Sequence, residues 1–326
     1  MRTWWPAFAS SSAIDAVRCW PPETTGKICK ADMMRILATW WILRRNEYGV
    51  HIVSCKTKLY FGGNFMQRVN LASLSFDPLN LDQAVQRIIE LAVIGAGDCR
   101  LVVTPNVDHV LRCRRSSSLA AIYRGAVLSL ADGMPIVWLS RLQGKPLPER
   151  VTGADLLPAL AVAAARANLS IFLFGGPPGA AEAAADQLRS RAAALKVGYY
   201  APPYGFESDL DENGRAIAEI NALKPDILFV GLGSPKQEVW IAKYAKDLHV
   251  DVALGVGAAI EFAAGRLKRA PKWMQNWGLE WIYRILKDPR RLFWRYASNV
   301  AFLVVIIDEL RQFARQKFRS KSPNKT

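Results

Sequence analysis

Short apolar runs that end at glycine, aspartate or proline alternate with helical patterns from Arg68 to Gly257. The apolar runs are too short for helices and are bounded by turn residues, which is typical of buried strands. Strands that alternate with helices are joined by crossover connections, and these pair the strands in parallel. The pattern therefore predicts an α/β fold: a Rossmann-like, doubly wound, mostly parallel sheet with a helical, basic C-terminal appendage.

The expected elements can be assigned along the chain. Strands are expected over residues 69–76, 101–103, 127–131, 171–174, 196–200, 227–230 and 252–254. Helices are expected over residues 80–94, 107–123, 155–167, 209–223, 273–286 and 291–318, with two more opening after the glycine-rich turns at 175–179 and 231–238. Asn80 is the expected N-cap of the first helix.

Three segments differ in character. Residues 1–65 have no sustained period, so we expect a poorly structured N-terminal extension, with two alternatives: a translation start assigned too early, since Met66 directly precedes the orderly pattern, or a membrane-proximal leader. Its apolar run at 36–43 is too short to span a bilayer. Residues 66–265 are the expected α/β core, and residues 266–326 are the basic, aromatic, membrane-proximal appendage.

The positive charge of the chain is concentrated in the appendage. Residues 266–326 hold fifteen Lys and Arg against four Asp and Glu, a net of +11 out of +15 for the whole chain. A basic tail on a nearly neutral body predicts contact with an anionic surface or anionic substrate groups, not with nucleic acid. The apolar run 300–307 favours equally a helix in the membrane interface and a core helix that packs back on the sheet.

Metal and disulfide sites have little support. The five cysteines are odd in number and show no CxxC spacing, which indicates neither a disulfide framework nor a zinc site and fits a reducing compartment. The three histidines are scattered. We therefore expect no metal and no cofactor.

Asp132 is the first candidate catalytic residue. A short apolar run stops there and is followed by Gly133 and Pro135. Ligands of open α/β sheets bind at the carboxyl ends of the strands, so an acid at this position would face the site. The alternative is that Asp132 caps the next helix.

A second candidate lies in the sequence Gly231-Leu-Gly-Ser-Pro-Lys-Gln, which follows a strand and opens a helix. Backbone N–H groups around Gly231 and Gly233, with the positive end of the helix, would favour an anion there. A tight turn is the alternative. A nicotinamide-dependent oxidoreductase is the rival enzyme, but the third glycine and the acid of the dinucleotide fingerprint are missing.

Two further polar pairs are interpreted as structural. Asp209 and Asp211 lie at a helix start, where the helix dipole stabilises acidic side chains. We therefore expect this structural role and not metal binding. Asp108 and His109 are adjacent on a helix and point in different directions, so we expect surface residues. The glycine-rich stretch 175–179 is expected to be a turn.

Seven motifs in order carry a resemblance to a known family. They are Thr104-Pro-Asn106, Ala131-Asp-Gly133, Glu149-Arg-Val-Thr-Gly-Ala-Asp155, Gly231-Leu-Gly-Ser-Pro-Lys-Gln-Glu238, Gly255-Val-Gly257, Arg269-Ala-Pro271 and Glu280-Trp-Ile-Tyr-Arg284. Over residues 69–295 the chain resembles the WecG/TagA/CpsF glycosyltransferases.

The resemblance implies an inverting hexosyltransferase of cell-surface or exopolysaccharide biosynthesis that needs no metal. Its partners would be a UDP-sugar donor, with an N-acetylmannosaminyl group as one candidate, and a polyprenyl-diphosphate-linked sugar acceptor. The enzyme would be cytoplasmic and peripheral on the anionic inner face of the bacterial plasma membrane, with a homo-oligomer left open. The rival outside enzymology is a membrane-binding adaptor, which explains the basic tail but leaves Asp132 without a role.

Carried over residue by residue, the resemblance makes Asp132 the general base, with Thr104 and Asn106 beside it. The remaining assigned residues contact the nucleotide-sugar or its diphosphate: Arg150, Gln237, Gly231 and Gly233 from the core, and Arg284, Arg291 and Arg295 from the appendage. A sugar hydroxyl has a pKa far above 7, so a carboxylate must accept its proton during attack. The departing UDP gains negative charge, which fixed guanidiniums stabilise.

Overall fold

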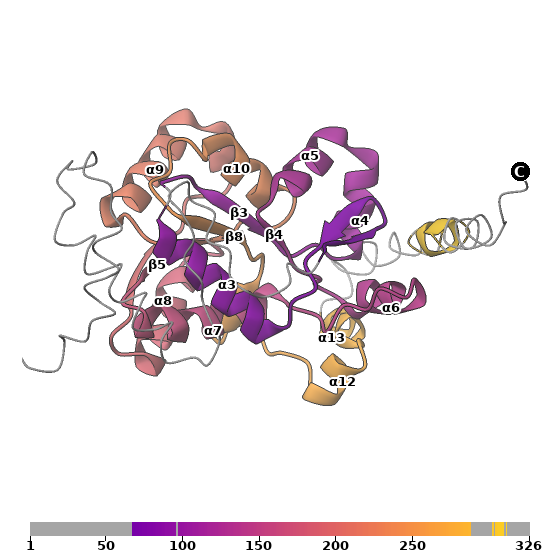
Figure 1. The fold of residues 1–326 in the computed structure, drawn as a ribbon. Helices are drawn as coiled ribbons and strands as arrows, with labels where there is room; N and C mark the ends of the chain where they lie inside the picture. The colour runs from indigo at the N-terminus through magenta and orange to yellow at the C-terminus, as the bar shows by residue number, and fades with distance from the viewer. Residues whose placement is uncertain (1–66, 96, 288–301, 303, 310, 312–326) are drawn as a thin grey trace, which may run out of the picture. The chain divides into compact units, whose positions relative to one another are not determined.

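Six parallel strands form the central sheet of the computed structural model, in the order β4-β3-β8-β7-β5-β6. Figure 1 labels β3, β4, β5 and β8 of this sheet. They are β3 (Arg100–Val103), β4 (Leu128–Ser129), β5 (Ser170–Gly175), β6 (Lys196–Tyr200), β7 (Ile227–Gly231) and β8 (Val252–Gly255). The structure describes residues 67–95, 97–287, 302, 304–309 and 311, which belong to one unit, Phe65–Thr326. The expected doubly wound parallel sheet is confirmed.

Side chains of the central strands alternate between two layers of helices. In β5, Ile171 and Leu173 pack against one layer, whereas Phe172 and Phe174 pack against the other. The first layer holds α3 (Leu81–Ile94), α7 (Gly153–Arg166), α8 (Ala180–Arg191) and the short α11 (Ala259–Ala263), and the second holds α9 (Leu210–Leu223) and α10 (Lys236–Tyr244), as Figure 1 shows for α8 and α9. Because both faces are covered, β7, β8 and the part of β5 after Ser170 carry only apolar residues and glycine.

A third apolar cluster lies beside β3 and β4. It contains side chains of α4 (Val107–Arg115), α5 (Ser117–Gly125), α6 (Met134–Leu142) and the antiparallel strands β1 (Val69–Leu71) and β2 (Leu74–Phe76). The single strand expected over 69–76 is therefore wrong. The chain turns at Ala72 and Ser73, which both adopt positive φ, and the turn brings Val69 opposite Phe76.

Two expected helices are each split by a local signal. Ser116 accepts the N–H of Leu119 on its Oγ, 3.2 Å away, so it caps α5 and separates it from α4. The helix expected over 273–286 is two helices, α12 (Lys272–Asn276) and α13 (Glu280–Lys287), with Gly278 at φ 68° between them. Asn80 caps α3 as expected, in a reciprocal capping box with Gln83.

The described part of the C-terminal apolar run packs back onto the domain. Phe302 and Val305 are buried in the third cluster, and Glu309 accepts hydrogen bonds from the Ala72 N–H (3.1 Å) and the Gln143 amide (2.6 Å). Most of residues 291–318 lie outside the described residues. Within the described ranges, no helix combines the length and the apolar character that a membrane crossing requires.

Candidate active site

The three residues expected to be catalytic meet at the carboxyl ends of β3 and β4. Thr104 and Asn106 follow β3, and Asp132 follows β4. The Asp132 N–H donates to the carbonyl of Pro105, 3.1 Å away, so Asp132 lies beside the residue that separates Thr104 from Asn106. Because the two strands are adjacent and parallel, their ends place these residues at one edge of the sheet.

Asp132 does not cap the following helix. The N-cap of α6 is Gly133, at φ 146°, and Asp132 stands one residue before this cap. The capping alternative considered from the sequence is therefore wrong. Asp132 is partly exposed at the sheet edge, where the strand-end position would place a functional acid.

Thr104 and Asn106 also have structural partners. Thr104 is buried, and its hydroxyl donates to the Gly255 carbonyl at the end of β8, 3.5 Å away. Asn106 caps α4 by accepting the His109 N–H on Oδ1, 3.3 Å away. These contacts hold the ends of β3 and β8 and the start of α4 together around Asp132.

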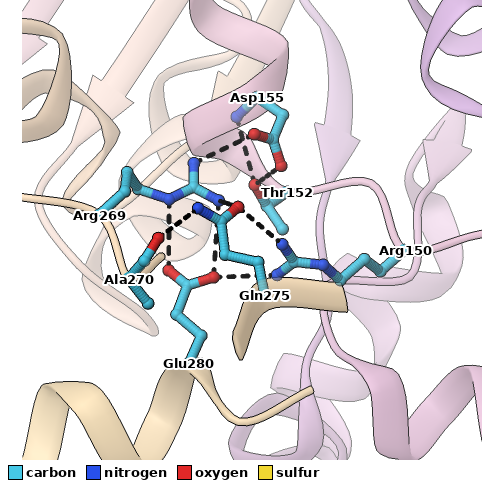
Figure 2. A network of polar contacts seen from close by, with 7 residues as sticks. All are labelled: Arg150, Thr152, Asp155, Arg269, Ala270, Gln275 and Glu280. Atoms are coloured by element: carbon cyan, nitrogen blue, oxygen red, sulfur yellow. Dashed lines mark hydrogen bonds and ion pairs between the residues drawn. The ribbon is translucent and has the colours of Figure 1, made fainter. Parts of the chain in front are cut away.

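Arg150 lies in a loop that runs beside the Asp132 segment. The neighbouring Val151 N–H donates to the Ala131 carbonyl, 2.8 Å away. The Arg150 guanidinium does not extend freely: its Nη1 donates to Glu280 at 3.0 Å and its Nη2 to Gln275 at 3.2 Å (Figure 2).

A second guanidinium completes this network. Arg269 donates from Nη1 to Asp155 at 3.1 Å and from Nη2 to Gln275 at 3.0 Å, and its Nε lies 3.4 Å from Glu280 (Figure 2). Thr152 caps α7 and donates to Asp155 at 2.6 Å. The network joins three of the recognised motifs, 149–155, 269–271 and 280–284, and sequence reasoning had not assigned roles to Asp155, Arg269, Gln275 or Glu280.

The two glycine-rich turns, 175–179 and 231–238, lie side by side where the strand order of the sheet reverses. β5 leads through α8 to β6 on one side, and β7 leads through α10 to β8 on the other, which makes this point a topological switch of the kind where α/β proteins bind ligands. The Gly176 N–H donates to the Gly231 carbonyl, 3.1 Å away. A Cβ on Gly231 would lie 2.7 Å from the Ile260 side chain, and Gly233 adopts φ 77°.

Gln237 is only 2 % exposed and uses its amide inside the protein. Its Oε1 accepts the Gly257 N–H at 2.9 Å, and its Nε2 donates to Glu238 at 2.8 Å. Gln237 therefore orders the loop after β8. Two neighbouring groups have a raised pKa. Burial is the larger cause and the charge of the buried Glu238 the second: together they raise the pKa of the Cys113 thiol to about 11 and the pKa of Tyr123 well above its ordinary value.

The polar pairs interpreted as structural have different outcomes. Asp209 caps α9 by accepting the N–H groups of Asp211 and Glu212, as expected. Asp108 and His109 are buried, so the surface interpretation is wrong: His109 Nδ1 lies 3.0 Å from the Tyr123 hydroxyl, and Asp108 pairs with Arg112 at 3.1 Å. Among the described residues, His, Cys, Asp and Glu form no group of three that could hold a metal ion.

The start of the appendage packs directly on the helix that follows Asp132. At Gly278, between α12 and α13, a Cβ would lie 2.6 Å from Met134 Cβ and 3.3 Å from Trp138. Arg284 belongs to α13, but its side chain and residues 291 and 295 lie outside what the structure describes. The contact of Arg284, Arg291 and Arg295 with the diphosphate therefore stays a prediction.

Comparison with known proteins identifies the family. The model of the glycosyl transferase WecG/TagA/CpsF family matches residues 69–317. An N-acetylglucosaminyldiphosphoundecaprenol N-acetyl-β-D-mannosaminyltransferase of Staphylococcus aureus (strain MW2) is 29% identical over 250 residues, 77% of this chain and 96% of that protein. The transferase of the same name from Bacillus spizizenii is 30% identical over 242 residues, 74% of this chain and 91% of that protein. The chain belongs to the WecG/TagA/CpsF family of glycosyltransferases.

Proposed function

We propose that this glycosyltransferase moves a hexosyl group, with N-acetylmannosamine as the first candidate, from a UDP-sugar to a polyprenyl-diphosphate-linked sugar with inversion. The observation that carries the proposal is the position of Asp132 at the carboxyl edge of the sheet. Its N–H donates to Pro105, the residue between Thr104 and Asn106. The relatives in Staphylococcus and Bacillus are named for transfer of N-acetylmannosamine to N-acetylglucosaminyl-diphosphoundecaprenol, which supplies the substrate class.

A single displacement accounts for inversion with one carboxylate. The acceptor hydroxyl oxygen attacks the anomeric carbon from the face opposite UDP, the carbon–oxygen bond to UDP breaks, and the hydroxyl proton passes to Asp132. A positioned carboxylate contributes about 10²- to 10⁴-fold to such a step. No second nucleophile is needed, because the sugar never becomes attached to the protein.

The departing UDP requires positive partners. The turn containing Gly231 and Gly233 leads into α10, whose N-terminus favours a phosphate, and Arg150 lies one residue from the backbone contact with the Asp132 segment. Arg284, Arg291 and Arg295 are the proposed contacts from the appendage. Guanidiniums suit this role because they bind phosphate oxygens in pairs.

A lipid-linked acceptor requires the protein to work at a membrane. We place the appendage at the anionic inner leaflet, as a peripheral contact. Its described part presents exposed apolar side chains, Trp273, Trp277, Trp281 and Leu286, within a strongly basic segment. Each basic residue near such a surface contributes about 1 kcal/mol. Purified protein should float with liposomes that contain anionic lipid and remain unbound with neutral ones.

Product analysis tests the transfer. A panel of UDP-sugars is offered with a short-chain prenyl-diphosphate-N-acetylglucosamine, with and without EDTA, and the product is identified by mass spectrometry. We expect one dominant donor, an inverted anomeric linkage by NMR and activity that EDTA leaves largely intact. The absence of any transfer from the panel would contradict the proposal.

Asp132→Asn tests the base. We expect a folded protein whose turnover falls by about 10²-fold or more, the contribution of a general base. Asp186→Asn is the matched control, because Asp186 pairs with Arg189 on α8, away from the sheet edge, and its turnover should stay at the wild-type level. Near wild-type turnover by folded Asp132→Asn would exclude the assigned role.

A further inference from the structure

In the network of Figure 2, the carboxylate of Glu280, from the appendage, contacts both Arg150 and Arg269. Its Oε2 accepts from Arg150 at 3.0 Å, and its Oε1 lies 3.4 Å from Arg269 Nε. The side chains of Glu280 and Arg150 are only 12 % and 16 % exposed. The two arginines come from different segments, so one carboxylate links three parts of the chain.

We propose that Glu280 is a positioning residue for sugar transfer: it fixes the Arg150 guanidinium and the first turn of α13 against the Asp132 edge of the sheet. The catalytic consequence of this role rests on the proposed function. Glu280 acts through Arg150 and α13, whereas Asp132 is the residue that acts on the reacting atoms.

The first support is the pair of contacts that surround the Asp132 segment. On one side, Arg150 precedes Val151, whose N–H donates to Ala131 at 2.8 Å, one residue before Asp132. On the other side, Gly278 packs on Met134, two residues after Asp132. Glu280 accepts a hydrogen bond from Arg150, the neighbour of Val151, and follows Gly278 by two residues, so α13 begins between two contacts that flank Asp132.

The second support is the charge balance of the network. Two guanidiniums, Arg150 and Arg269, face two carboxylates, Asp155 and Glu280. Asp155 is bonded to Arg269, so Glu280 supplies the carboxylate that the network offers to Arg150. Replacing Glu280 by a neutral side chain leaves Arg150 paired in this network only with the amide of Gln275, and a partly buried guanidinium without a carboxylate is displaced towards solvent or another anion.

The third support is helical spacing. Position 284 follows Glu280 by four residues in α13, and residues four apart share a face of a helix. Fixing Glu280 therefore fixes the placement of the helix face that carries position 284.

The test compares three full-length variants. Glu280→Gln keeps the shape and removes the charge, Glu280→Asp keeps the charge, and Glu90→Gln is the control, because Glu90 forms an ion pair with Arg87 at 3.1 Å in α3, far from the network in sequence. The readouts are kcat and KM for the UDP-sugar, Tm, and amide hydrogen exchange of peptides that cover residues 272–287.

We expect Glu280→Gln to lower kcat about tenfold or more and to speed exchange in α13 about tenfold, with Tm close to that of Glu90→Gln and with Glu280→Asp restoring part of both. Gly278→Ala introduces the 2.6 Å contact with Met134 at a residue of positive φ, so it should also lower kcat and speed exchange in α13, but with a lower Tm. This second variant keeps the proposal testable if Glu280→Gln does not fold.

Two results would overturn the proposal. Wild-type kcat and wild-type exchange in Glu280→Gln would show that the contact positions neither Arg150 nor α13. A loss of kcat that is proportional to the loss of Tm, and that Glu280→Asp does not restore, would show that Glu280 has only a structural role. If the wild-type protein moves no sugar, the proposed function fails, but the exchange measurement still decides whether Glu280 holds α13.

Discussion

Single glycines determine how closely the loops of the site approach one another. A Cβ on Gly255, at the end of β8, would lie 2.7 Å from Gln237 Nε2 and 3.1 Å from its Cδ. Gln237 cannot swing away freely, because its amide is bonded to Gly257 and Glu238 inside the protein. The absence of a side chain at this position therefore lets Gln237 order the loop beside Thr104.

Gly255→Ala should lower the free energy of unfolding by about 1–3 kcal/mol, the usual cost of overpacking. Gly214→Ala is the matched control: a Cβ there meets nothing within 4 Å, and alanine stabilises a helix interior by about 0.5–1 kcal/mol relative to glycine. Urea unfolding of both variants measures the difference. Equal stabilities for the two would mean that Gln237 is not confined as described.

At the scale of elements, caps place the site residues. Asn106 lies between the end of β3 and the first turn of α4. Its side chain caps the helix, and its position brings it close to Asp132. The same holds for Thr152, which caps α7 and orients Asp155 towards Arg269. Helix starts of this kind allow a substitution to separate a capping role from a chemical one.

Asn106→Ser provides that separation. Serine caps as well as asparagine does, whereas Asn106→Ala should lower the free energy of unfolding by about 1 kcal/mol. If Asn106 assists Asp132, Asn106→Ser should keep wild-type stability yet lose turnover, as judged by thermal unfolding and the transfer assay together. Wild-type turnover in the serine variant would restrict Asn106 to capping.

An ion pair ties the 3-10 turn η1 (Phe206–Ser208) to the start of α10: Lys236 Nζ lies 2.6 Å from Glu207. Burial alone would raise the pKa of Glu207, but the hydrogen bond from Lys236, a backbone hydrogen bond and the charge of Lys236 hold that pKa below its ordinary value. A lowered carboxylate pKa stabilises the fold above the unfolded value, about 4.3, and this stability is lost as the pH falls through the folded value.

Lys236→Met should therefore lower the free energy of unfolding by about 0.2–1 kcal/mol at neutral pH, as expected for an exposed pair. The difference from the wild type should shrink as the pH falls from about 5 to about 3, because Glu207 then becomes neutral in both proteins. Urea unfolding at several pH values measures it. A difference that is constant with pH would point to lost packing of the lysine stem instead.

At the scale of the whole molecule, the family match begins at residue 69 and ends at residue 317. It therefore includes the α/β core and most of the appendage, whose described start is tied to the core by Glu280 and Gly278. The two segments named from composition, 66–265 and 266–326, share contacts at the proposed site.

A shortened chain that begins at Met66 should remain folded and active. The reason is that residues 1–65 show no sustained period and precede the family match. Circular dichroism, thermal unfolding and the transfer assay compare it with the full chain. A loss of Tm or of turnover in the shortened chain would show that the extension is needed.

Periodicity, caps and turn residues were enough to predict the layered α/β fold, because each acts over a few residues. The apolar runs of β5, β7 and β8 and the caps Asn80 and Asp209 are local signals of this kind. The strand-end position of Asp132 followed from the same reasoning, since parallel strands must end at a common edge.

The partners of charged and polar side chains were decided only in three dimensions. Arg150 meets Glu280 across 130 positions of the chain, and Gly278 meets Met134, and no local pattern encodes either pairing. His109 is buried beside Tyr123 of α5, whose hydroxyl also lies 3.4 Å from Ser234 in the turn before α10. Burial and ion pairing depend on which elements pack together, and that is a property of the whole fold.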